Sequence, residues 1–424
     1  MAVTIVAGAQ WGDEGKGRVV DLLAQDADLV IRCQGGPNAG HTVVNEHGRF
    51  VLHSVPSGVF SERARCVIGA GTVISPVGLA KEMRLLVEAG IDIGRLLISE
   101  RAHLILPYHP LIERLEEERR SDERRVAPTG QGVGPAYADK AARRGFRAGD
   151  LLDLAEFRGR LREETAWQNR LLAAFDRPPV DADEILAEME PAAAFLAPHI
   201  GDTVGPAFEV LESGRSVILE GQLGVMRDLD WGAYPFVTSS SPTPAGMLAG
   251  AGIPPNCVER VIGVVKAYTT AVGTGPFPTE LTGAEGDLLR ERGAEYGATT
   301  GRPRRCGWFN AVAVAWAARV AGFTELVLTK VDVLDGIPRI PICTAYRDGA
   351  RSIDAFPTTG LMGRVRPVCE EMPGWSDGTS GARTVSDLPA EARRYVEEVE
   401  RRVGVPITMV SVGPERESAI KRVA

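Results

Sequence analysis

The chain has 424 residues, of which 44% are hydrophobic and 25% charged, and its formal net charge is −8. This length allows two or three lobes, or one large α/β domain with insertions, and the composition is that of a globular protein. The acidic balance excludes nucleic-acid binding through bulk charge, although it leaves room for a local basic pocket that binds an anionic metabolite.

The N-terminal residues MAVTIVAGAQ contain no basic segment and enter an apolar run at once, so they do not indicate a signal peptide. No apolar run is long enough to span a membrane. The cysteines at positions 33, 66, 257, 306, 343 and 369 include no C-x-x-C pair, which argues against a zinc knuckle and a disulfide scaffold. These features predict buried, reduced thiols in a cytoplasmic protein.

Short runs rich in Val, Ile and Leu recur along the chain and are predicted to be strands. They cover residues 3–8, 29–33, 66–71, 96–100, 216–221, 260–268, 325–332 and 407–413. Several are apolar throughout, which is typical of strands buried on both faces of a mostly parallel sheet. Helical patterns lie between them, as over 310–322, so the sequence predicts an α/β fold around a large central sheet.

The segment from about 110 to 215 differs, because it is rich in charged residues at helical spacing. It predicts a mostly helical insertion with a solvated face, in which one helix opens at Asp150 as its N-cap. Near the C-terminus, residues 389–404 predict a helix that starts with Pro389 and stops at Gly404.

The first glycine-rich loop, GAQWGDEGKG at residues 8–17, lies between a predicted strand and a helical pattern. This arrangement can hold phosphate through backbone N–H groups and a helix N-terminus, with Lys16 as a positive charge. It is neither a Walker A loop, because Gln10 and Gly17 occupy its key places, nor a G-x-G-x-x-G loop. Asp13 would repel phosphate unless it holds Mg²⁺ or accepts a proton; the simpler alternative is a helix N-cap.

A second loop, GGPNAGHTV at 35–43, also follows a predicted strand and carries Asn38, His41 and Thr42. We expect it at the carboxyl edge of the strand neighbouring the first one, with His41 as a general acid or a phosphate contact. The tetrapeptide TKVD at 329–332 offers Lys330 for a purine face and Asp332 for the two N–H donors of guanine.

A third loop, GATTGRPRRCGW at 297–308, brings Arg302, Arg304 and Arg305 together between glycines and threonines. Arginines bind carboxylates and phosphates in a bidentate fork, so the loop favours a dicarboxylate or phosphate ligand. A charged surface loop is the alternative.

In this order the motifs resemble the adenylosuccinate synthetase family along the whole chain. Further matching segments are HSVPSG (53–58), GVGPAYADKAARRG (132–145), YPFVTSS (234–240), GPFPTEL (275–281), TKVDVLDG (329–336) and MPGW (372–375). The resemblance implies a P-loop-like GTP-binding ligase fold, in a single domain over 1–424 that carries the helical insertion and forms a homodimer.

The resemblance also implies an activity: GTP-dependent ligation of L-aspartate to IMP through 6-phosphoryl-IMP, which gives adenylosuccinate, GDP and phosphate in the AMP branch of purine biosynthesis. Asp13 would take the N1 proton of IMP and touch Mg²⁺, with the Gly40 carbonyl as a second ligand of the ion. His41 would act as an acid toward the transferring phosphoryl group, and Lys16 would hold phosphates. Neither a nucleic acid nor a membrane is implied as a partner.

The binding residues implied by the resemblance fall into three sets. The GTP set is Gly12, Asp13, Glu14, Gly15, Lys16, Gly17, Arg18, Gly40, His41, Thr42, Arg304, Lys330, Val331, Asp332, Ser411, Val412 and Gly413. The IMP set is Asp13, Asn38, Ala39, Thr129, Arg143, Leu223, Thr238 and Arg302, with Arg143 reaching the site of the partner subunit. The aspartate set is Ala298, Thr299, Thr300, Gly301, Arg302 and Arg304.

The sequence departs from the family pattern around the acceptor nucleotide. EGQLG at 220–224 places Leu223 where the family has a glutamine that contacts the purine. Nearby, Ala271 stands for an arginine, Trp231 for a histidine and Ser241 for an asparagine; Pro128 and Gln131 also differ from the usual residues.

Three interpretations of these departures stay open. In the first the activity is the standard one, and Gln222 replaces Leu223 in the contact through a small shift of the loop. In the second the chain is a paralogue that joins aspartate to a different oxo-purine nucleotide. In the third it is a non-catalytic GTP-binding regulator, which would leave Asp13, His41 and the arginine loop without a use.

Overall fold

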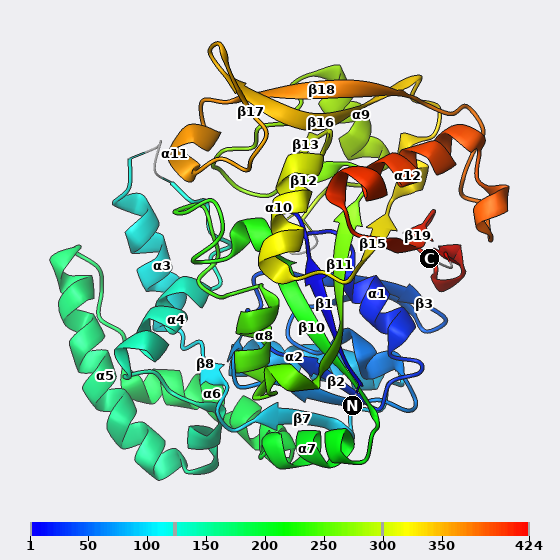
Figure 1. The fold of residues 1–424 in the computed structure, drawn as a ribbon. Coiled ribbons are helices and arrows are strands. Elements are labelled where there is room, and N and C mark those ends of the chain that lie inside the picture. Colours follow the sequence, from blue (N-terminus) through cyan, green and yellow to red (C-terminus); the bar gives the residue numbers. More distant parts are fainter. Residues whose placement is uncertain (1, 122–124, 298–300, 423–424) are drawn as a thin grey trace.

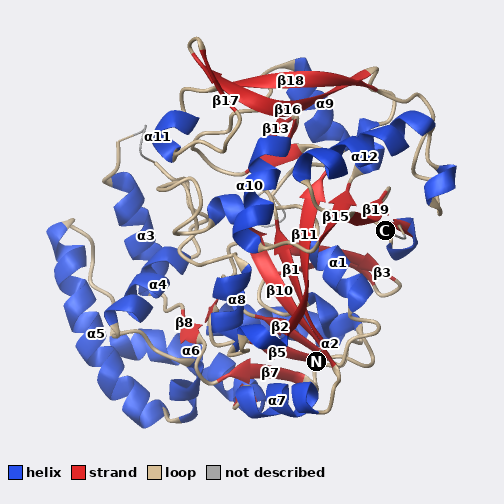
Figure 2. Ribbon diagram, viewed as in Figure 1, coloured by secondary structure: helices blue, strands red, loops and turns tan. Residues whose placement is uncertain are grey.

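The computed structural model describes residues 2–121, 125–297 and 301–422. A ten-stranded sheet crosses the centre of the molecule, with helices packed around it (Figure 1, Figure 2). In spatial order its strands are β20 (Ala419–Lys421), β19 (Ile407–Ser411), β15 (Glu325–Thr329), β11 (Val258–Lys266), β1 (Ala2–Gly8), β10 (Ser216–Gly224), β2 (Leu29–Arg32), β5 (Arg65–Ile68), β7 (Leu96–Ser99) and β9 (Ile200–Gly201).

All neighbouring strands from β19 to β9 run parallel, and β20 is antiparallel to β19. Each of the eight apolar runs forms a strand of this sheet, so the predicted α/β fold with a mostly parallel sheet is confirmed. The two short edge strands β9 and β20 were not predicted, because they lack the apolar runs of the central strands.

The sheet separates two hydrophobic cores, which explains why its strands are apolar throughout. Alternate residues of one strand enter different cores: Ile5 of β1 packs on one side and Val6 on the other. Helices α7 (Val204–Glu212), α10 (Ala311–Ala321) and α12 (Ala390–Val403) cover the face of Ile5, and α1 (Lys16–Leu23) and α2 (Pro76–Glu88) cover the face of Val6. A strand buried on both faces needs an apolar residue at every position.

The insertion is mostly helical, as predicted, and most of it lies at one side of the sheet (Figure 1). Its helices are α3 (Tyr108–Glu118), α4 (Val133–Ala142), α5 (Leu154–Ala174) and α6 (Ala182–Leu196). The prediction that Asp150 caps the long helix is wrong: Asp153 is the N-cap of α5 and accepts from the N–H groups of Ala155 and Glu156. Asp150 instead belongs to a preceding 3₁₀ turn over Ala148–Leu152.

A second sheet, absent from the sequence-based prediction, lies across one end of the molecule (Figure 2). It consists of β14 (Phe309–Asn310), β16 (Arg339–Asp348), β17 (Arg351–Ile353) and β18 (Arg366–Pro373). The C-terminal helix α12 has the predicted limits, with Pro389 before it and Gly404, in a left-handed conformation, after it. The remaining elements are β3 (His41–Asn45), β4 (Gly48–Leu52), β6 (Val73–Ile74), β8 (His103–Leu104), β12 (Thr269–Ala271), β13 (Arg305–Gly307), α8 (Pro244–Ala251), α9 (Ala284–Arg292) and α11 (Thr359–Met362).

The cysteines are all free thiols, and five of them are buried as predicted. Cys369 is the exception: it is exposed on β18, opposite Cys343 of β16. Over the described parts of the chain, the search for a helix long and apolar enough to cross a bilayer finds none.

The order of strands in the central sheet places the three predicted loops. Because parallel strands end at the same edge, the segments after β15, β1, β10 and β2 meet at one edge of the sheet. The prediction that β2 neighbours β1 is wrong, since β10 lies between them. TKVD and the C-terminal strand therefore lie on one side of the Asp13 loop, and the segments after β10 and β2 lie on the other.

Candidate active site

The loop after β1 has a backbone that few side chains tolerate. Gly12 and Gly15 have φ of 105° and 94°, and Asp13 between them has φ of 61°. A residue other than glycine rarely adopts this conformation, and such strain is concentrated at functional sites. Asp13, Arg143, Leu223 and Lys330, all predicted site residues, are among seven such residues in the described chain.

Glu14 holds this loop from the inside. Its buried carboxylate accepts from the backbone N–H groups of Gln10, at 3.1 Å, and Gly12, at 2.9 Å. Lys16 donates to the other oxygen of Glu14 at 2.6 Å and is itself buried. In this structure Lys16 is therefore turned to a carboxylate inside the loop.

Helix α1 begins at Lys16, and its N-cap is Gly15, which offers no side-chain hydrogen bond. The alternative that Asp13 is the helix N-cap is therefore wrong. The first N–H groups of such a helix end attract an anion. Gly17, in the first turn, has no room for a side chain, because an added Cβ would lie 2.6 Å from the Cβ of His41.

His41 begins β3 and packs against this helix end. Its Nδ1 lies 2.5 Å from Oε1 of Glu220, a buried residue of β10. Burial and the nearby Arg32 lower the pKa of His41 to about 4, although Glu220 opposes the shift. The imidazole is therefore neutral; Nδ1 carries the proton given to Glu220, and Nε2 is left for another partner.

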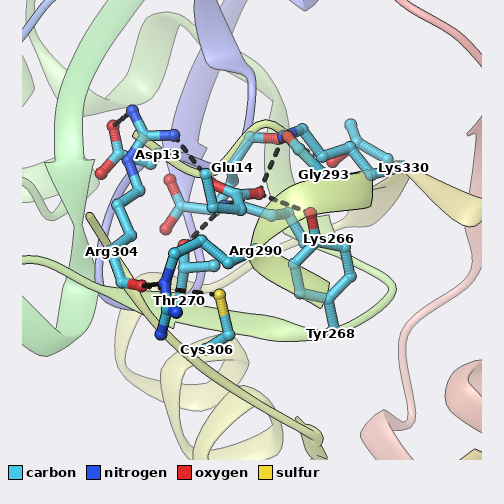
Figure 3. Close-up of polar contacts among 12 residues, drawn as sticks. Asp13, Glu14, Lys266, Tyr268, Thr270, Arg290, Gly293, Arg304, Cys306 and Lys330 are labelled. Atoms are coloured by element: carbon cyan, nitrogen blue, oxygen red, sulfur yellow. Dashed lines mark hydrogen bonds and ion pairs between the residues drawn. The ribbon is translucent and has the colours of Figure 1, made fainter. Parts of the chain in front are cut away.

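Asp13 is held by the arginine loop. Nη2 of Arg304 donates to Oδ1 of Asp13 at 3.0 Å, and Nη1 of the same guanidinium donates to Oε2 of Glu295 at 2.7 Å. Figure 3 shows Asp13 and Arg304 at one edge of a polar cluster and Lys330 at the opposite edge. The third predicted loop is thus joined to the first by one arginine, which bridges the carboxylates of Asp13 and Glu295.

Glu295 is the centre of this cluster, although no motif in the sequence pointed to it. Its buried carboxylate also accepts from Lys266 at 2.9 Å and from Lys330 at 2.8 Å. Burial alone would raise the pKa of Glu295, but Lys266, Lys330 and Arg304 together hold it well below its usual range. Burial in turn lowers the pKa of Lys266 to about 8. One carboxylate therefore fixes the position of three cations.

The segment after β15 contains a buried carboxylate oxygen without a hydrogen-bond partner. Oδ1 of Asp332 is buried and has no hydrogen-bond partner among the described residues, and burial raises the pKa of this carboxyl group. Arg18 donates to the Ser411 hydroxyl and to the Glu415 carbonyl, and Asp332 acts electrostatically on it. A buried carboxylate oxygen without a partner costs free energy, which a ligand with N–H donors would recover. Val331, which precedes Asp332, and Val412, which follows β19, are also buried.

A cavity of about 380 Å³ opens on the other side of Asp13. It brings together predicted residues from segments that lie far apart in the sequence. Its lining includes Asp13, Asn38, Ala39, Gly40, Thr129, Leu223, Thr238 and Arg304. Arg227, which follows β10, also lines the cavity and was not predicted from the sequence.

Other predicted residues lie outside this cavity or outside the described chain. Arg143 is exposed at the C-terminal end of α4, with φ of 63°. Gly301 and Arg302 are exposed, and Gly297 N–H donates to the Arg302 carbonyl at 2.8 Å. The aspartate positions Ala298, Thr299 and Thr300 lie outside the described residues. Thr42 is half-buried in β3, and Gly413 follows β19.

The structure shows what surrounds several of the positions that depart from the family pattern. Gln222 does not take over the contact of Leu223, because its amide is already bound: Oε1 accepts from Gly36 N–H at 2.9 Å, and Nε2 donates to the Gly36 carbonyl at 2.8 Å. Nε2 also donates to Oδ1 of Asn38 at 3.1 Å. Ser241 donates to Asp228, and Trp231 is exposed.

Comparisons with known proteins agree along the whole chain. The family model described as adenylosuccinate synthetase matches residues 5–420. Adenylosuccinate synthetase of Moorella thermoacetica is 50% identical over 422 residues, which are 99% of each chain, and that of Halothermothrix orenii is 47% identical over 424 residues, 100% of this chain and 99% of the relative.

Two solved structures are also similar. The fully ligated adenylosuccinate synthetase of Plasmodium falciparum superposes with a TM-score of 0.94 at 33% identity over the full length of both chains. Succinoaminodeoxyadenylate synthetase of cyanophage S-2L, bound to dGMP and dATP, gives a TM-score of 0.64 at 20% identity and covers 100% of this chain and 96% of its own. At that identity the second likeness concerns the fold alone.

Proposed function

Because the chain belongs to the adenylosuccinate synthetase family, it joins L-aspartate to IMP at the expense of GTP in purine biosynthesis, and we propose how its residues divide this work. The observation that carries the proposal is the order of segments along the sheet edge. The guanine-type site after β15 lies on one side of Asp13, and the cavity proposed for the acceptor lies on the other. Phosphoryl transfer needs the donor and acceptor to be aligned across the reacting atoms.

Asp13 is the proposed base. It would accept the N1 proton of IMP, so that O6 becomes nucleophilic and attacks the γ-phosphorus of GTP with loss of GDP. The aspartate amine then attacks C6 of 6-phosphoryl-IMP, and phosphate leaves. Arg304, paired with Asp13 in the ligand-free protein, would bind the aspartate carboxylate or a phosphate when ligands enter, since a guanidinium serves either.

The N-terminus of α1 is the proposed phosphate site, with Lys16 and His41 beside it. Lys16 would share its charge between Glu14 and the phosphates. His41 is neutral without ligand, and the negative charge of a nearby phosphate would raise its pKa. Nε2 would then donate to a phosphoryl oxygen while Glu220 holds Nδ1.

The guanine site would use Asp332, whose free Oδ1 suits the N1–H and amine donors of guanine. The ammonium of Lys330 is bound to Glu295 and to the Gly293 carbonyl at 2.6 Å, so its aliphatic stem is the part available to a purine face. Ser411, Val412 and Gly413 would close this site.

A magnesium ion suits the donors at the reacting centre. Mg²⁺ binds oxygen atoms, keeps several waters and is held by one or two protein groups together with substrate phosphates. Asp13, whose side chain is 23% exposed, and Gly40 both line the cavity. The described residues form no group of three or more His, Cys, Asp and Glu side chains fit for a metal. The Asp13 carboxylate and the Gly40 carbonyl would therefore hold the ion with the phosphates, whose charge it neutralises.

The proposed reaction is tested by turnover of the purified protein with GTP, Mg²⁺, L-aspartate and IMP. We expect adenylosuccinate and GDP to form in equal amounts, to depend on aspartate and to stop when EDTA removes the metal. The ultraviolet change of adenylosuccinate and chromatography of GDP follow the two products. GTP binding without adenylosuccinate would contradict IMP as the acceptor and would direct the same assay to other oxo-purine nucleotides.

We also propose a homodimer, acting in the cytoplasm, in which Arg143 completes the site of the partner subunit. Arg143 is exposed at the end of α4, and the exposed Trp231 and Tyr234 belong to the segment that borders the acceptor cavity. An exposed arginine and large exposed aromatic side chains are typical components of a subunit interface.

Mixing two inactive variants tests this arrangement. Arg143→Ala and Asp13→Asn should each be nearly inactive, whereas a mixture that has exchanged subunits should regain about a quarter of the wild-type activity, since half of the dimers then carry one intact site. Turnover before and after exchange, with size measured by light scattering, gives the answer. A mixture as inactive as its components would contradict the shared site, and Asp13→Asn mixed with itself is the control.

A further inference from the structure

Two positions at or beside the acceptor cavity carry apolar side chains where the resembling family has polar ones. Leu223 lines the cavity where the resembling family has glutamine, and the buried Ala271 stands where that family has arginine. A leucine and an alanine cannot donate a hydrogen bond to a nucleotide. If these departures were uncompensated, polar atoms of the bound nucleotide would be left without partners.

Gln222, the adjacent polar side chain, cannot repair this loss. It is fully buried, and both atoms of its amide are engaged by Gly36 and Asn38. The side chain of Leu223 packs against the loop after β1: its Cδ2 lies 3.5 Å from the position of a Cβ added to Gly12. Hydrogen-bonding capacity on this wall therefore does not come from Gln222, and the next polar side chain along this segment that lines the cavity is Arg227.

Arg227 has that capacity and the right position. It lies in a short 3₁₀ turn, Val225–Arg227, directly after β10, and it lines the same cavity as Asp13 and Leu223. Nη1 of its guanidinium donates to the Phe236 carbonyl at 2.6 Å, and Nη2 donates to the carbonyl of Val272. Val272 directly follows Ala271, so the guanidinium lies beside the position from which the family arginine is missing.

The charge of Arg227 is not balanced by these partners. Both acceptors are neutral carbonyls, whereas a half-buried cation such as Arg227 is stabilised best by an opposite charge. Burial and the nearby Arg305 lower the pKa of Arg227 to about 10, and Asp13 opposes this shift, so the side chain stays charged at neutral pH. Two of the five N–H donors of the guanidinium bind the carbonyls of Phe236 and Val272, which leaves three for a ligand.

We propose that Arg227 is a binding and specificity-determining residue of the acceptor site, whose guanidinium donates to an oxygen of the nucleotide that enters the cavity. It would supply from position 227 the hydrogen bonding that positions 223 and 271 lack. The same residue fixes the backbone of the site, because its own carbonyl accepts from the N–H of Thr238 at 2.9 Å. This inference rests on the proposed function, in which the cavity holds IMP.

The test compares Arg227→Leu, Arg227→Lys and the double variant Leu223→Gln/Arg227→Leu. Titration calorimetry measures IMP and GTP binding separately, and steady-state assays measure KM for each substrate. We expect Arg227→Leu to weaken IMP binding roughly 10- to 100-fold, as for loss of a charged hydrogen bond, with GTP affinity nearly unchanged. Arg227→Lys should lie between it and the wild type, and the added glutamine of the double variant should recover part of the lost IMP affinity.

The opposite results would overturn the inference. Unchanged IMP affinity in Arg227→Leu would remove the contact, and an equal fall for IMP and GTP with a lower melting temperature would reduce Arg227 to a structural role. Arg215→Leu, an exposed arginine at the opposite end of β10, is the matched control. Wild-type turnover is measured first: a wild type that makes no adenylosuccinate contradicts the proposed function itself, whereas an active wild type with an unaffected variant contradicts only the role of Arg227.

Discussion

Asp13→Asn is expected to abolish adenylosuccinate formation while GTP still binds. The substitution keeps the shape of the side chain but removes its ability to accept a proton and its negative charge. General-base catalysis contributes about 10²- to 10⁴-fold to a rate, and loss of a metal ligand adds to that effect. Asparagine also suits the left-handed backbone at this position, where φ is 61°, so the loop should keep its conformation.

The measurement pairs single-turnover product formation with GTP titration. Asp26→Asn is the matched control, because Asp26 is exposed just beyond α1 and away from the strand edge that carries the site. An Asp13→Asn variant with near-normal turnover would contradict the base assignment. A variant that lost GTP binding as well would indicate that the pair between Arg304 and Asp13 supports the fold of the loop.

The central sheet was predictable because its strands are buried on both faces. In β2 every residue is buried, so its local sequence predicts a strand without knowledge of the strands beside it. The second sheet was not predictable in this way. In β18 every residue is exposed or half-buried, and the sequence RPVCEEMP contains no apolar run. Its strands depend on pairing with β16, which the local sequence does not encode.

The spatial order of the strands in the central sheet could not be predicted from the apolar runs of the sequence either. Placing β10 between β1 and β2 brings residues 179 positions apart into contact, as in the pair of Glu220 with His41. The motifs indicated phosphate, guanine and dicarboxylate ligands because the loops proposed to bind such groups depend on short local spacing. They did not predict Arg227 and Glu295, whose partners lie between 9 and 45 positions away and on other elements of the fold.

Arg227 and Glu295 escaped prediction for a common physical reason. Glycine, proline and clustered charges mark a loop in the sequence, but a single glutamate within AEYG carries no such mark. Its importance arises only when β11, β15 and the arginine loop deliver Lys266, Lys330 and Arg304 to one point. The proposed guanine site and the Asp13 carboxylate are then joined through one buried carboxylate, so a change at Glu295 should affect both stability and binding.

Glu295→Gln is the test with the largest expected effect on stability. The amide keeps the volume of the side chain but leaves three cations around a neutral group in a buried site. Removing one partner of a buried ion pair costs about 3–5 kcal/mol, which urea unfolding would detect directly. The variant should also raise KM for GTP and for aspartate, because Lys330 and Arg304 lose their common anchor, with a smaller effect on KM for IMP.

The loss of stability should depend on pH in a defined direction. Lys266 has a pKa of about 8 in the folded protein, already below its ordinary value, and Glu295 is the group that opposes further lowering. Without that carboxylate the folded-state pKa falls further, so the unfolded chain binds more protons than the folded variant and stability rises with pH. The deficit relative to wild type should therefore be largest near pH 6, shrink as the pH rises toward about 8, and stay level at higher pH, where Lys266 has lost its proton in both folded proteins.

A charge-balanced variant separates this explanation from simple misfolding. Glu295→Gln/Lys266→Met removes one of the stranded cations and should recover part of the lost stability. Glu291→Gln, an exposed glutamate of α9 four positions earlier, should leave unfolding and all three KM values close to wild type. A Glu295→Gln protein that unfolds like the wild type at every pH would contradict the role of this carboxylate. A deficit that the double variant does not reduce would show that packing, rather than uncompensated charge, sets the cost, because methionine removes the cation while retaining most of the apolar stem.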